Sequence, residues 1–417
     1  MNLSTLLGEE LIPATGCTEP ISVAYITAVL SDYGKKNTPE NLNLQIDANL
    51  YKNSLSVVIP GTSGLKGLRM AMALGWLYGD PDKELDVLET IPADGVEHAR
   101  EWIDHVDPEI TVKKEWDSPA ITASAVTEQH QLEAMIRGSH LGLKQVSVDG
   151  ETVFEEERSE ESEADSLKQL KRLHLDDLVE SLPSVVEDQR ELLNNAIAMN
   201  RAMVDGALDD HPDLSLDAVE DHTTVTGRAR LYVRAAVWAR MSGRKQSVMS
   251  SGGSGNAGLM ATLPLKAYEE LNSDLGEVDV LEALALSHLI NIYIRGYIDR
   301  LSSWCGGVIA AGAGACAGLA YLEDPSPEFI RTALHHFISA KFGLLCDGAK
   351  VGCSIKLSSA ISPIFEAIDL SRQGVKLPEG EAWVGKRFRD TMESIESFYT
   401  SSMKEQLEEN MIRTFGA

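Results

Sequence analysis

The chain has 417 residues, of which 43% are hydrophobic and 24% are charged, proportions typical of a folded globular protein rather than a disordered or collagen-like one. Asp and Glu number 64 against 37 Lys and Arg, which gives a formal net charge of -27. Because nucleic-acid phosphates and anionic lipid surfaces repel a polyanion of this size, we expect neither nucleic acid nor a membrane as a partner.

The first 160 residues mix helical and strand patterns. Apolar residues at helical spacing predict helices at 3–12, 21–33, 64–78 and 96–105. Alternating patterns predict strands at 42–50, 55–59, 84–91, 110–116, 120–126, 131–138 and 144–148. Asp149-Gly150 is a predicted hairpin turn. A break at 13–20 precedes the second helix, which is predicted to begin near Thr18, so that Cys17 lies just outside its amino terminus.

A dense acidic stretch at 155–165 predicts a connector between two domains. Beyond it the apolar pattern is helical, and we expect no strand after residue 160. The predicted helices are 167–173, 176–182, 187–209, 226–242, 259–271, 278–300, 308–322, 327–342, 358–371 and a final helical region 386–415. The predicted fold class is therefore α+β: an amino-terminal α+β domain with a small sheet, residues 1–160, followed by a large all-α domain, residues 161–417.

The segment Leu301 to Leu322 contains no charged residue, yet its middle is mostly Gly and Ala. Such a segment is typical of a helix buried in a protein core, where small residues let neighbours approach closely, more than of a membrane span. The amino terminus has no basic region of the kind that begins a secretory signal. We therefore expect a cytoplasmic protein. The sequence does not determine the oligomeric state, and it is compatible with a homo-oligomer.

Five cysteines are present, an odd number that argues for reduced thiols rather than a disulfide framework. Cys305, Cys346 and Cys353 lie beside or near glycines, and three thiolates from two loops could hold a metal ion or an iron–sulfur cluster. The alternative is that they are ordinary buried cysteines. Cys316 follows Cys305 by 11 residues on the Ala/Gly helix and is interpreted as core packing.

Cys17 precedes a predicted helix, whose positive amino-terminal end lowers the pKa of a thiol. It is a candidate general base or nucleophile, and an unreactive turn cysteine is the equal alternative. The loop at 250–258, which contains Ser254, Gly255 and Asn256, leads into a helix and favours binding of a carboxylate or phosphate over a flexible linker. A cluster of polar residues at 49–53 alone indicates no more than a turn.

Six short motifs, in this order along the chain, resemble the L-cysteine desulfidase family, which is related to the α chain of the iron–sulfur L-serine dehydratase of bacteria. The resemblance covers nearly the whole length. The motifs are Gly16-Cys17-Thr18-Glu19-Pro20, Tyr51-Lys52-Asn53, Ile59-Pro60-Gly61-Thr62, Ser254-Gly255-Asn256, Cys305-Gly306, and Cys346-Asp347-Gly348-Ala349-Lys350 through Cys353.

The resemblance implies a [4Fe-4S] cluster held by Cys305, Cys346 and Cys353, with Cys17 as the proton acceptor. It implies an iron without a protein ligand that acts as a Lewis acid on the leaving group of an amino-acid substrate. The implied substrate contacts are Lys52, Asn53, Ser254, Gly255 and Asn256. The implied reaction is β-elimination of L-cysteine to pyruvate, ammonia and sulfide.

Other functions stay open at this stage. Ala257 replaces the polar residue expected in relatives, so dehydration of L-serine by the same cluster is the first alternative. A pyridoxal-phosphate dehydratase performs the same net reaction, but it requires a Schiff-base lysine in a parallel α/β domain. A cluster-bearing redox sensor is the non-enzymatic alternative, and it requires a DNA-binding or partner-binding module that the acidic chain does not suggest.

Overall fold

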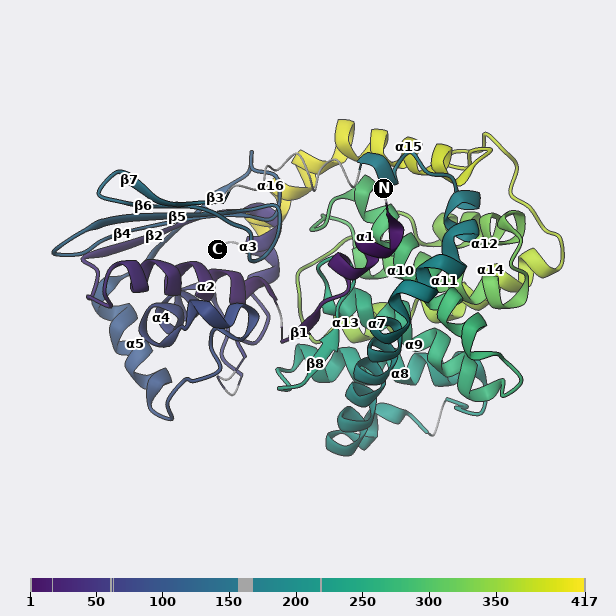
Figure 1. Ribbon diagram of the computed structural model, residues 1–417, viewed down its shortest axis with the longest axis horizontal. Helices are drawn as coiled ribbons and strands as arrows, with labels where there is room; N and C mark the ends of the chain where they lie inside the picture. Colours follow the sequence, from purple (N-terminus) through teal and green to yellow (C-terminus); the bar gives the residue numbers. More distant parts are fainter. Residues whose placement is uncertain are drawn as a thin grey trace.

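The computed structural model describes residues 2–16, 18–60, 62, 64–156, 168–217 and 220–415. Two portions lie side by side along the long axis of the molecule (Figure 1): a sheet with helices on one side, and a larger body made almost wholly of helices. The predicted α+β class, a small amino-terminal sheet followed by a large helical portion, is confirmed.

Six strands form the sheet in the order β3-β2-β4-β5-β6-β7, and only the β2–β3 pair is parallel among these described strands. Every second residue of β4 and β5 is buried, because successive side chains of a strand point to opposite faces. The strands are β2 (Asn41–Asp47), β3 (Glu109–Lys113), β4 (Ala120–Val126), β5 (Gln131–Arg137), β6 (Leu143–Val148) and β7 (Glu151–Glu155).

Helix α2 (Thr18–Tyr33) packs directly on the sheet, and α4 (Leu68–Tyr78) and α5 (Gly95–Val106) form a further layer beyond it (Figure 1). The predicted turn at Asp149-Gly150 joins β6 to β7 as expected, with φ of 54° and 84° at its two residues.

Two strand predictions in this portion are wrong. Residues 84–91 contain the end of a 3-10 helix, η1 (Pro81–Asp86), and a turn, because Asp80 caps that segment and Pro81 favours its first helical position. Residues 55–59 form a turn with one isolated bridge, Val58 to Lys66. The predicted strand 42–50 ends early at Asp47, whose carboxylate accepts hydrogen bonds from two backbone N–H groups and so begins α3 (Ala48–Ser54).

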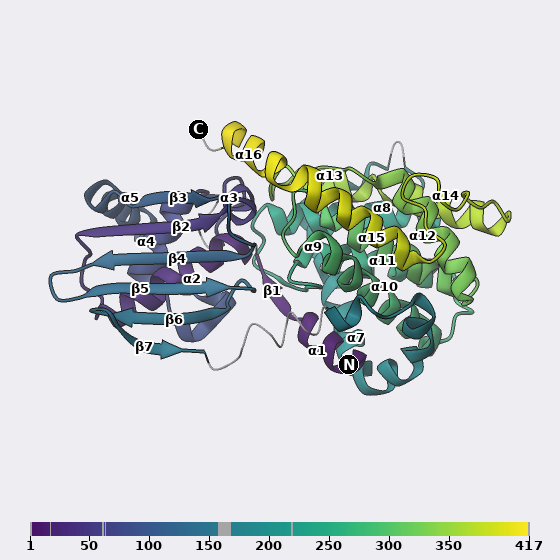
Figure 2. The same ribbon diagram turned by 90° about the horizontal axis from the view of Figure 1, so that it is seen from above.

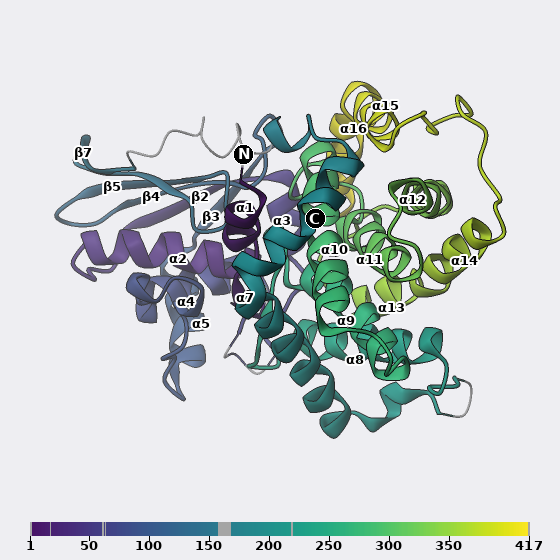
Figure 3. The ribbon, with the colours of Figure 1, turned by 45° about the vertical axis from the view of Figure 1, so that its right-hand side comes forward.

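In the helical portion α7 runs along α8, α9 and α10 (Figure 3), and α11 is surrounded by α9, α10, α12 and α14. Predicted helices 176–182 and 187–209 form the single kinked helix α7. The helices are α7 (Leu175–Asp210), α8 (Val225–Met241), α9 (Gly255–Leu271), α10 (Glu277–Ile298), α11 (Gly306–Glu323), α12 (Pro327–Lys341), α13 (Cys353–Ser358), α14 (Ile361–Arg372), α15 (Phe388–Phe398) and α16 (Lys404–Phe415), with short turns η2 (Pro212–Ser215) and η3 (Tyr399–Met403).

Helix α11 is long and apolar enough by composition to cross a membrane, yet 72% of it is buried inside the protein. Small residues explain how it is enclosed. A Cβ on Gly314 would lie 2.2 Å from the backbone oxygen of Ser287 on α10, so the two helices approach at the limit that glycine permits. Helix α11 is therefore a buried core helix, as the sequence predicted.

The first residues of the chain pack on the helical portion. Leucines of α1 (Leu3–Glu10) lie in the same core as α7 to α11. Strand β1 (Pro13–Thr15) pairs with β8 (Ser247–Met249), so the expectation of no strand after residue 160 is wrong. Three residues are too few for an alternating pattern to be visible. The acidic stretch falls largely in 157–167, outside the described residues, and the boundary at 160 stays a prediction.

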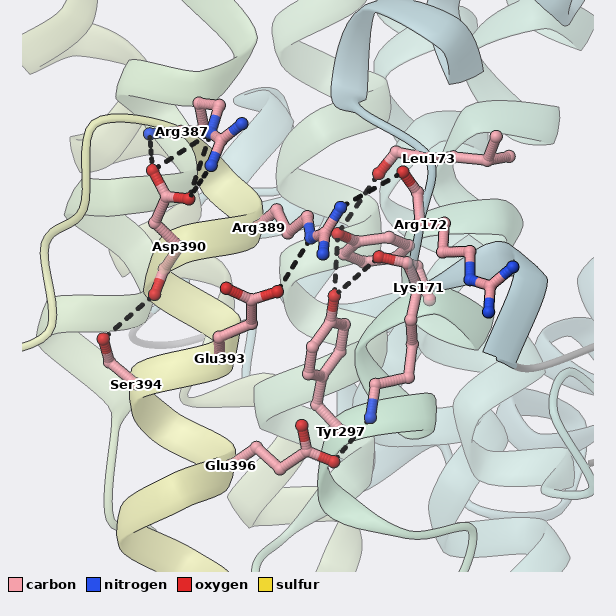
Figure 4. Close-up of polar contacts among 11 residues, drawn as sticks. Lys171, Arg172, Leu173, Tyr297, Arg387, Arg389, Asp390, Glu393, Ser394 and Glu396 are labelled. Carbon is pink, nitrogen blue, oxygen red and sulfur yellow. Dashed lines mark hydrogen bonds and ion pairs between the residues drawn. The ribbon is translucent and has the colours of Figure 1, made fainter.

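The carboxy-terminal helices connect the two portions. Figure 4 shows the contacts between α15 and the segment before α7. Lys171 donates a hydrogen bond to the Glu396 carboxylate. Arg389 donates to Glu393 on its own helix and to the backbone oxygen of Arg172. Beyond η3, α16 leaves the helical portion and lies against α3 of the sheet portion (Figure 2). The end of the chain thus contacts both portions.

Candidate functional site

Two segments of the helical portion meet in a short antiparallel bridge between Trp304 and Leu345. The Cys305 N–H donates to the backbone oxygen of Leu344 at 2.8 Å, and the Cys346 N–H donates to that of Ser303 at 2.8 Å. These two hydrogen bonds hold together cysteines that are far apart in sequence. The indole ring of Trp304 anchors the bridge in the core.

The third cysteine of the predicted ligand set, Cys353, is the first residue of α13, and its thiol lies 3.7 Å from the backbone oxygen of Gly348. Burial raises the pKa of the Cys305 thiol to about 12, and the neighbouring Cys346 and Cys353 act in the same direction. Burial also raises the pKa of Cys353. The thiols of Cys305 and Cys353 therefore favour the neutral form in the metal-free protein.

Among the residues that the structure describes, no three His, Cys, Asp or Glu side chains are arranged around a single metal ion. Three thiols near glycines, with Cys305 buried and Cys346 and Cys353 partly buried, nevertheless fit an iron–sulfur cluster, whose iron atoms take Cys thiolates and whose ligands lie further apart than those of one ion. Two histidines of α12 have other partners: His335 contacts Thr391, and His336 contacts the backbone oxygen of Val375. Cys316 lies fully buried in α11, where burial alone raises its pKa, as expected for core packing.

Helix α3 of the sheet portion reaches this cysteine group. The Cys346 thiol lies 3.9 Å from the Asn53 carboxamide oxygen, and the Asn53 amide donates to the Glu19 carboxylate at 3.1 Å. Lys52 donates to the backbone oxygen of Ser302 at 3.0 Å. Both predicted α3 residues therefore lie beside the segments that carry the cysteines, and the Lys52 ammonium is already bound to protein oxygen.

Cys17 lies outside the described residues, but its chain neighbours are described. Helix α2 begins at Thr18, the position that the sequence predicted. The backbone oxygen of Gly16 accepts a hydrogen bond from Arg240 of α8. A Cβ on Gly16 would lie 2.4 Å from Pro60, and its φ is 67°, so this turn requires glycine.

The predicted anion loop is joined to the amino-terminal motif through the same arginine. Arg240 donates to the Asn256 carboxamide oxygen at 3.0 Å as well as to Gly16. Ser254 caps α9 by accepting from the backbone N–H of Ala257. A Cβ on Gly255 would lie 2.5 Å from Arg240 Nε, so the loop contains glycine where the guanidinium passes. The loop is thus built around Arg240.

Sequence reasoning missed four residues here: Arg240, Arg295, Arg300 and His140. His140, on the hairpin between β5 and β6, has a buried Nε2 with no hydrogen-bond partner among the described residues. Burial lowers its pKa, Glu19 opposes that effect, and the three arginines add to it. A Cβ on Gly253 would lie 4.0 Å from His140 Nδ1 and 3.8 Å from a terminal nitrogen of Arg300, so both side chains lie at the loop before α9. No sequence signal identifies these residues, because each fits an ordinary helix or turn pattern and only the fold brings them together.

The comparisons with known proteins agree with this arrangement. Residues 97–410 match the family described as serine dehydratase alpha chain, a range that contains Cys305, Cys346, Cys353 and the loop before α9. The chain belongs to the serine dehydratase alpha chain family. Thus the predicted relation to that dehydratase is confirmed, whereas membership of the L-cysteine desulfidase branch stays a prediction.

Similar proteins cover nearly the full chain. A UPF0597 protein of Desulfatibacillum aliphaticivorans is 33% identical, over 96% of this chain and 94% of the relative. A UPF0597 protein of Clostridium tetani is 31% identical, over 96% of this chain and 95% of the relative. A UPF0597 protein of Desulfotalea psychrophila is 32% identical, over 94% of this chain and 93% of the relative. The similarity therefore extends over the amino-terminal motifs that lie before residue 97.

The turn at Gly348 gives a test of how the cysteine segment is positioned. Gly348 has φ of 91°, and a Cβ there would lie 2.9 Å from the backbone oxygen of Lys52. Gly374 has φ of 72° but no atom within 4 Å of an added Cβ. Both Gly→Ala variants should lose about 1–2 kcal/mol of unfolding free energy from the left-handed backbone.

Only Gly348→Ala should also push the loop away from α3 and increase the rate at which a maleimide alkylates Cys346 in cluster-free protein. Mass spectrometry of the alkylated peptide measures that rate. Equal alkylation rates in the two variants would show that contact with Lys52 does not position the cysteine segment.

Proposed function

We propose that this protein is an iron–sulfur lyase that eliminates the β-substituent of L-cysteine and yields pyruvate, ammonia and sulfide. The observation that carries the proposal is the meeting of Cys305 and Cys346 with Asn53, where the sheet portion contacts the helical portion, with Arg295 lying between Gly306 and the loop before α9. Membership of the serine dehydratase alpha chain family supports a lyase. Dehydration of L-serine to pyruvate and ammonia at the same site is the alternative.

In this proposal Cys305, Cys346 and Cys353 hold a [4Fe-4S] cluster. When bound, the cluster supplies an iron atom without a protein ligand, which is a Lewis acid toward the thiol or hydroxyl of the substrate. Metal binding displaces the protons of the thiols, so the raised pKa of Cys305 and of Cys353 in the metal-free protein does not prevent ligation. The donor set of three thiols agrees with an enzyme in which one coordination position belongs to the substrate.

Cys17 removes the proton from the substrate Cα. A thiol immediately before a 16-residue helix lies at the positive end of its dipole, which favours the thiolate that a base requires. The loop of Ser254, Gly255 and Asn256 binds the substrate carboxylate at the amino terminus of α9. Asn53 adds a polar contact, and Lys52 holds α3 and Asn53 beside the cysteine segment.

Two observations disfavour the other functions. Parallel pairing among the described strands is confined to β2 and β3, and the loop before α9 follows β8 in a helical portion, unlike the parallel α/β domain of a pyridoxal-phosphate dehydratase. For a redox sensor, the family assignment offers no support, because it names a dehydratase chain. The cytoplasm stays the predicted location, where free thiols persist.

The cysteine ligands can be tested by substitution. Cys305→Ser, Cys346→Ser and Cys353→Ser should each lose the iron of anoxically purified protein, because a hydroxyl is a poor replacement for thiolate on iron. Cys316→Ser is the matched control: it should lower stability, since it buries a hydroxyl, yet keep iron near the wild-type level. Iron and acid-labile sulfide per chain are the measurement. Iron loss in Cys316→Ser with retention in one of the others would refute the ligand assignment.

The role of Cys17 has a separate test. Cys17→Ser should keep the cluster but lose roughly 10²–10⁴-fold in elimination, because a serine hydroxyl is too weak an acid to serve as the base near neutral pH. NMR of substrate incubated in D₂O measures exchange of the Cα proton. Exchange at the wild-type rate in the cluster-loaded variant would mean that another residue removes the proton.

A further inference from the structure

Buried arginines surround the glycine-rich loop that precedes α9. A Cβ on Gly252 would lie 2.7 Å from Arg295 Cδ, and one on Gly255 would lie 2.5 Å from Arg240 Nε. These distances are shorter than a Cβ can tolerate, so the glycines make room for arginine side chains from α10 and α8. The pattern of glycines in the loop therefore reflects the presence of two guanidinium groups.

Arg240 and Arg295 are 4% and 6% exposed, and neither forms an ion pair with a carboxylate in the part of the chain that the structure describes. Arg240 donates to the neutral oxygens of Gly16 and Asn256, and its Nε is buried without a hydrogen-bond partner among the described residues. Arg295 donates to the Asn291 carboxamide and to the backbone oxygen of Arg300.

Other buried or nearby arginines do have acidic partners. Arg300 binds both oxygens of the Glu10 carboxylate. Arg234, on the same helix as Arg240 and 3% exposed, binds Glu220 with both of its terminal nitrogens. Arg240 and Arg295 thus differ from Arg300 and Arg234 in forming no ion pair with a carboxylate in the described structure, although Glu10 and Glu19 act on Arg295 electrostatically.

A buried charge with only neutral partners is unfavourable, and a negative ligand relieves that cost. The two guanidiniums lie against the loop that opens α9, a helix of 17 residues whose amino terminus adds a positive potential. An unpartnered Nε–H facing Gly255 provides a further donor at the same place. The positive groups at this place therefore favour the binding of a small anion. A carboxylate is the suitable class, because a guanidinium can donate two parallel hydrogen bonds to it.

We propose that Arg240 and Arg295 bind the α-carboxylate of the amino-acid substrate on either side of this loop. The identity of the substrate rests on the proposed function, whereas the anion site does not. Arg240 also donates to the backbone oxygen of Gly16. A Cβ on Gly306, the residue after Cys305, would lie 3.3 Å from a terminal nitrogen of Arg295, so this arginine lies between the loop and the segment of Cys305.

Lys52, the one cation among the substrate contacts that the resemblance implies, is poorly placed to bind a carboxylate. Its ammonium group donates to the backbone oxygen of Ser302 and to the Asn49 carboxamide, and its side chain is buried in those contacts. It fastens α3 to the segment before Cys305. The cations that bind the carboxylate beside the loop before α9 therefore come from α8 and α10 of the helical portion, not from α3.

The test measures ligand binding rather than turnover. Cluster-containing protein, handled without oxygen, is titrated calorimetrically with L-alanine, which has the carboxylate and amine but no β leaving group, and with L-alaninamide, which lacks the carboxylate charge. Wild-type protein should bind L-alanine and not L-alaninamide. Arg240→Gln and Arg295→Gln should each weaken L-alanine binding about 10- to 100-fold, as expected for loss of a charged hydrogen bond.

Arg234→Gln is the matched control, because it removes an equally buried arginine from α8. It should lower the unfolding temperature and leave the L-alanine affinity unchanged. If Arg240→Gln does not fold, Arg240→Lys keeps the charge, and its L-alanine affinity should fall between those of wild type and Arg295→Gln, since lysine lacks the planar fork of donors.

Unchanged L-alanine affinity in both Gln variants would overturn the inference, and the lyase proposal would survive if pyruvate still forms. If wild-type protein binds L-alanine through these arginines but forms pyruvate from neither L-cysteine nor L-serine, the lyase proposal would be wrong. The carboxylate site would then remain supported. Iron loss with normal L-alanine binding in Arg295→Gln would overturn the role of Arg295, whose charge would then serve the cysteine group.

Discussion

The short bridge between Trp304 and Leu345 is the contact on which the proposed site depends. Its two backbone hydrogen bonds hold Cys305 and Cys346 together across 41 positions of sequence. Tyr399, in the carboxy-terminal segment formed by α15 and η3, lies next to the bridge. Its hydroxyl accepts a hydrogen bond from the backbone N–H of Ser303. The end of the chain therefore contributes to holding the segment that carries Cys305.

The sheet portion completes the same site from the other side. Helix α3 begins because Asp47 caps it, and it carries Lys52 to the segment before Cys305 and Asn53 to Cys346. Helix α16 returns to α3, where Glu408 binds Asn49. Contacts to the proposed site thus come from both portions, so we expect the proposed reaction to require both.

The sequence predicted the parts of the fold whose signals are local. Helical spacing located α8 to α12, and glycine beside cysteine identified Cys305, Cys346 and Cys353 as a group. Strand β8 was not predictable because three residues show no period, and α3 was missed because its start depends on one capping carboxylate. Arg240 and Arg295 fit ordinary helical patterns, so their burial against Gly255 and Gly252 became visible only in three dimensions. The net charge of -27 likewise gave no indication of these two buried arginines.

The most direct test of the central claim is a product assay on protein purified without oxygen. Iron and labile sulfide are quantified first, and pyruvate and sulfide are then measured during incubation with L-cysteine and, separately, with L-serine. The account predicts bound iron–sulfur cluster and pyruvate formation that stops when air destroys the cluster, with equimolar sulfide from L-cysteine. Cluster-containing protein that forms pyruvate from neither amino acid, or pyruvate formation that continues after all iron is lost, would contradict it.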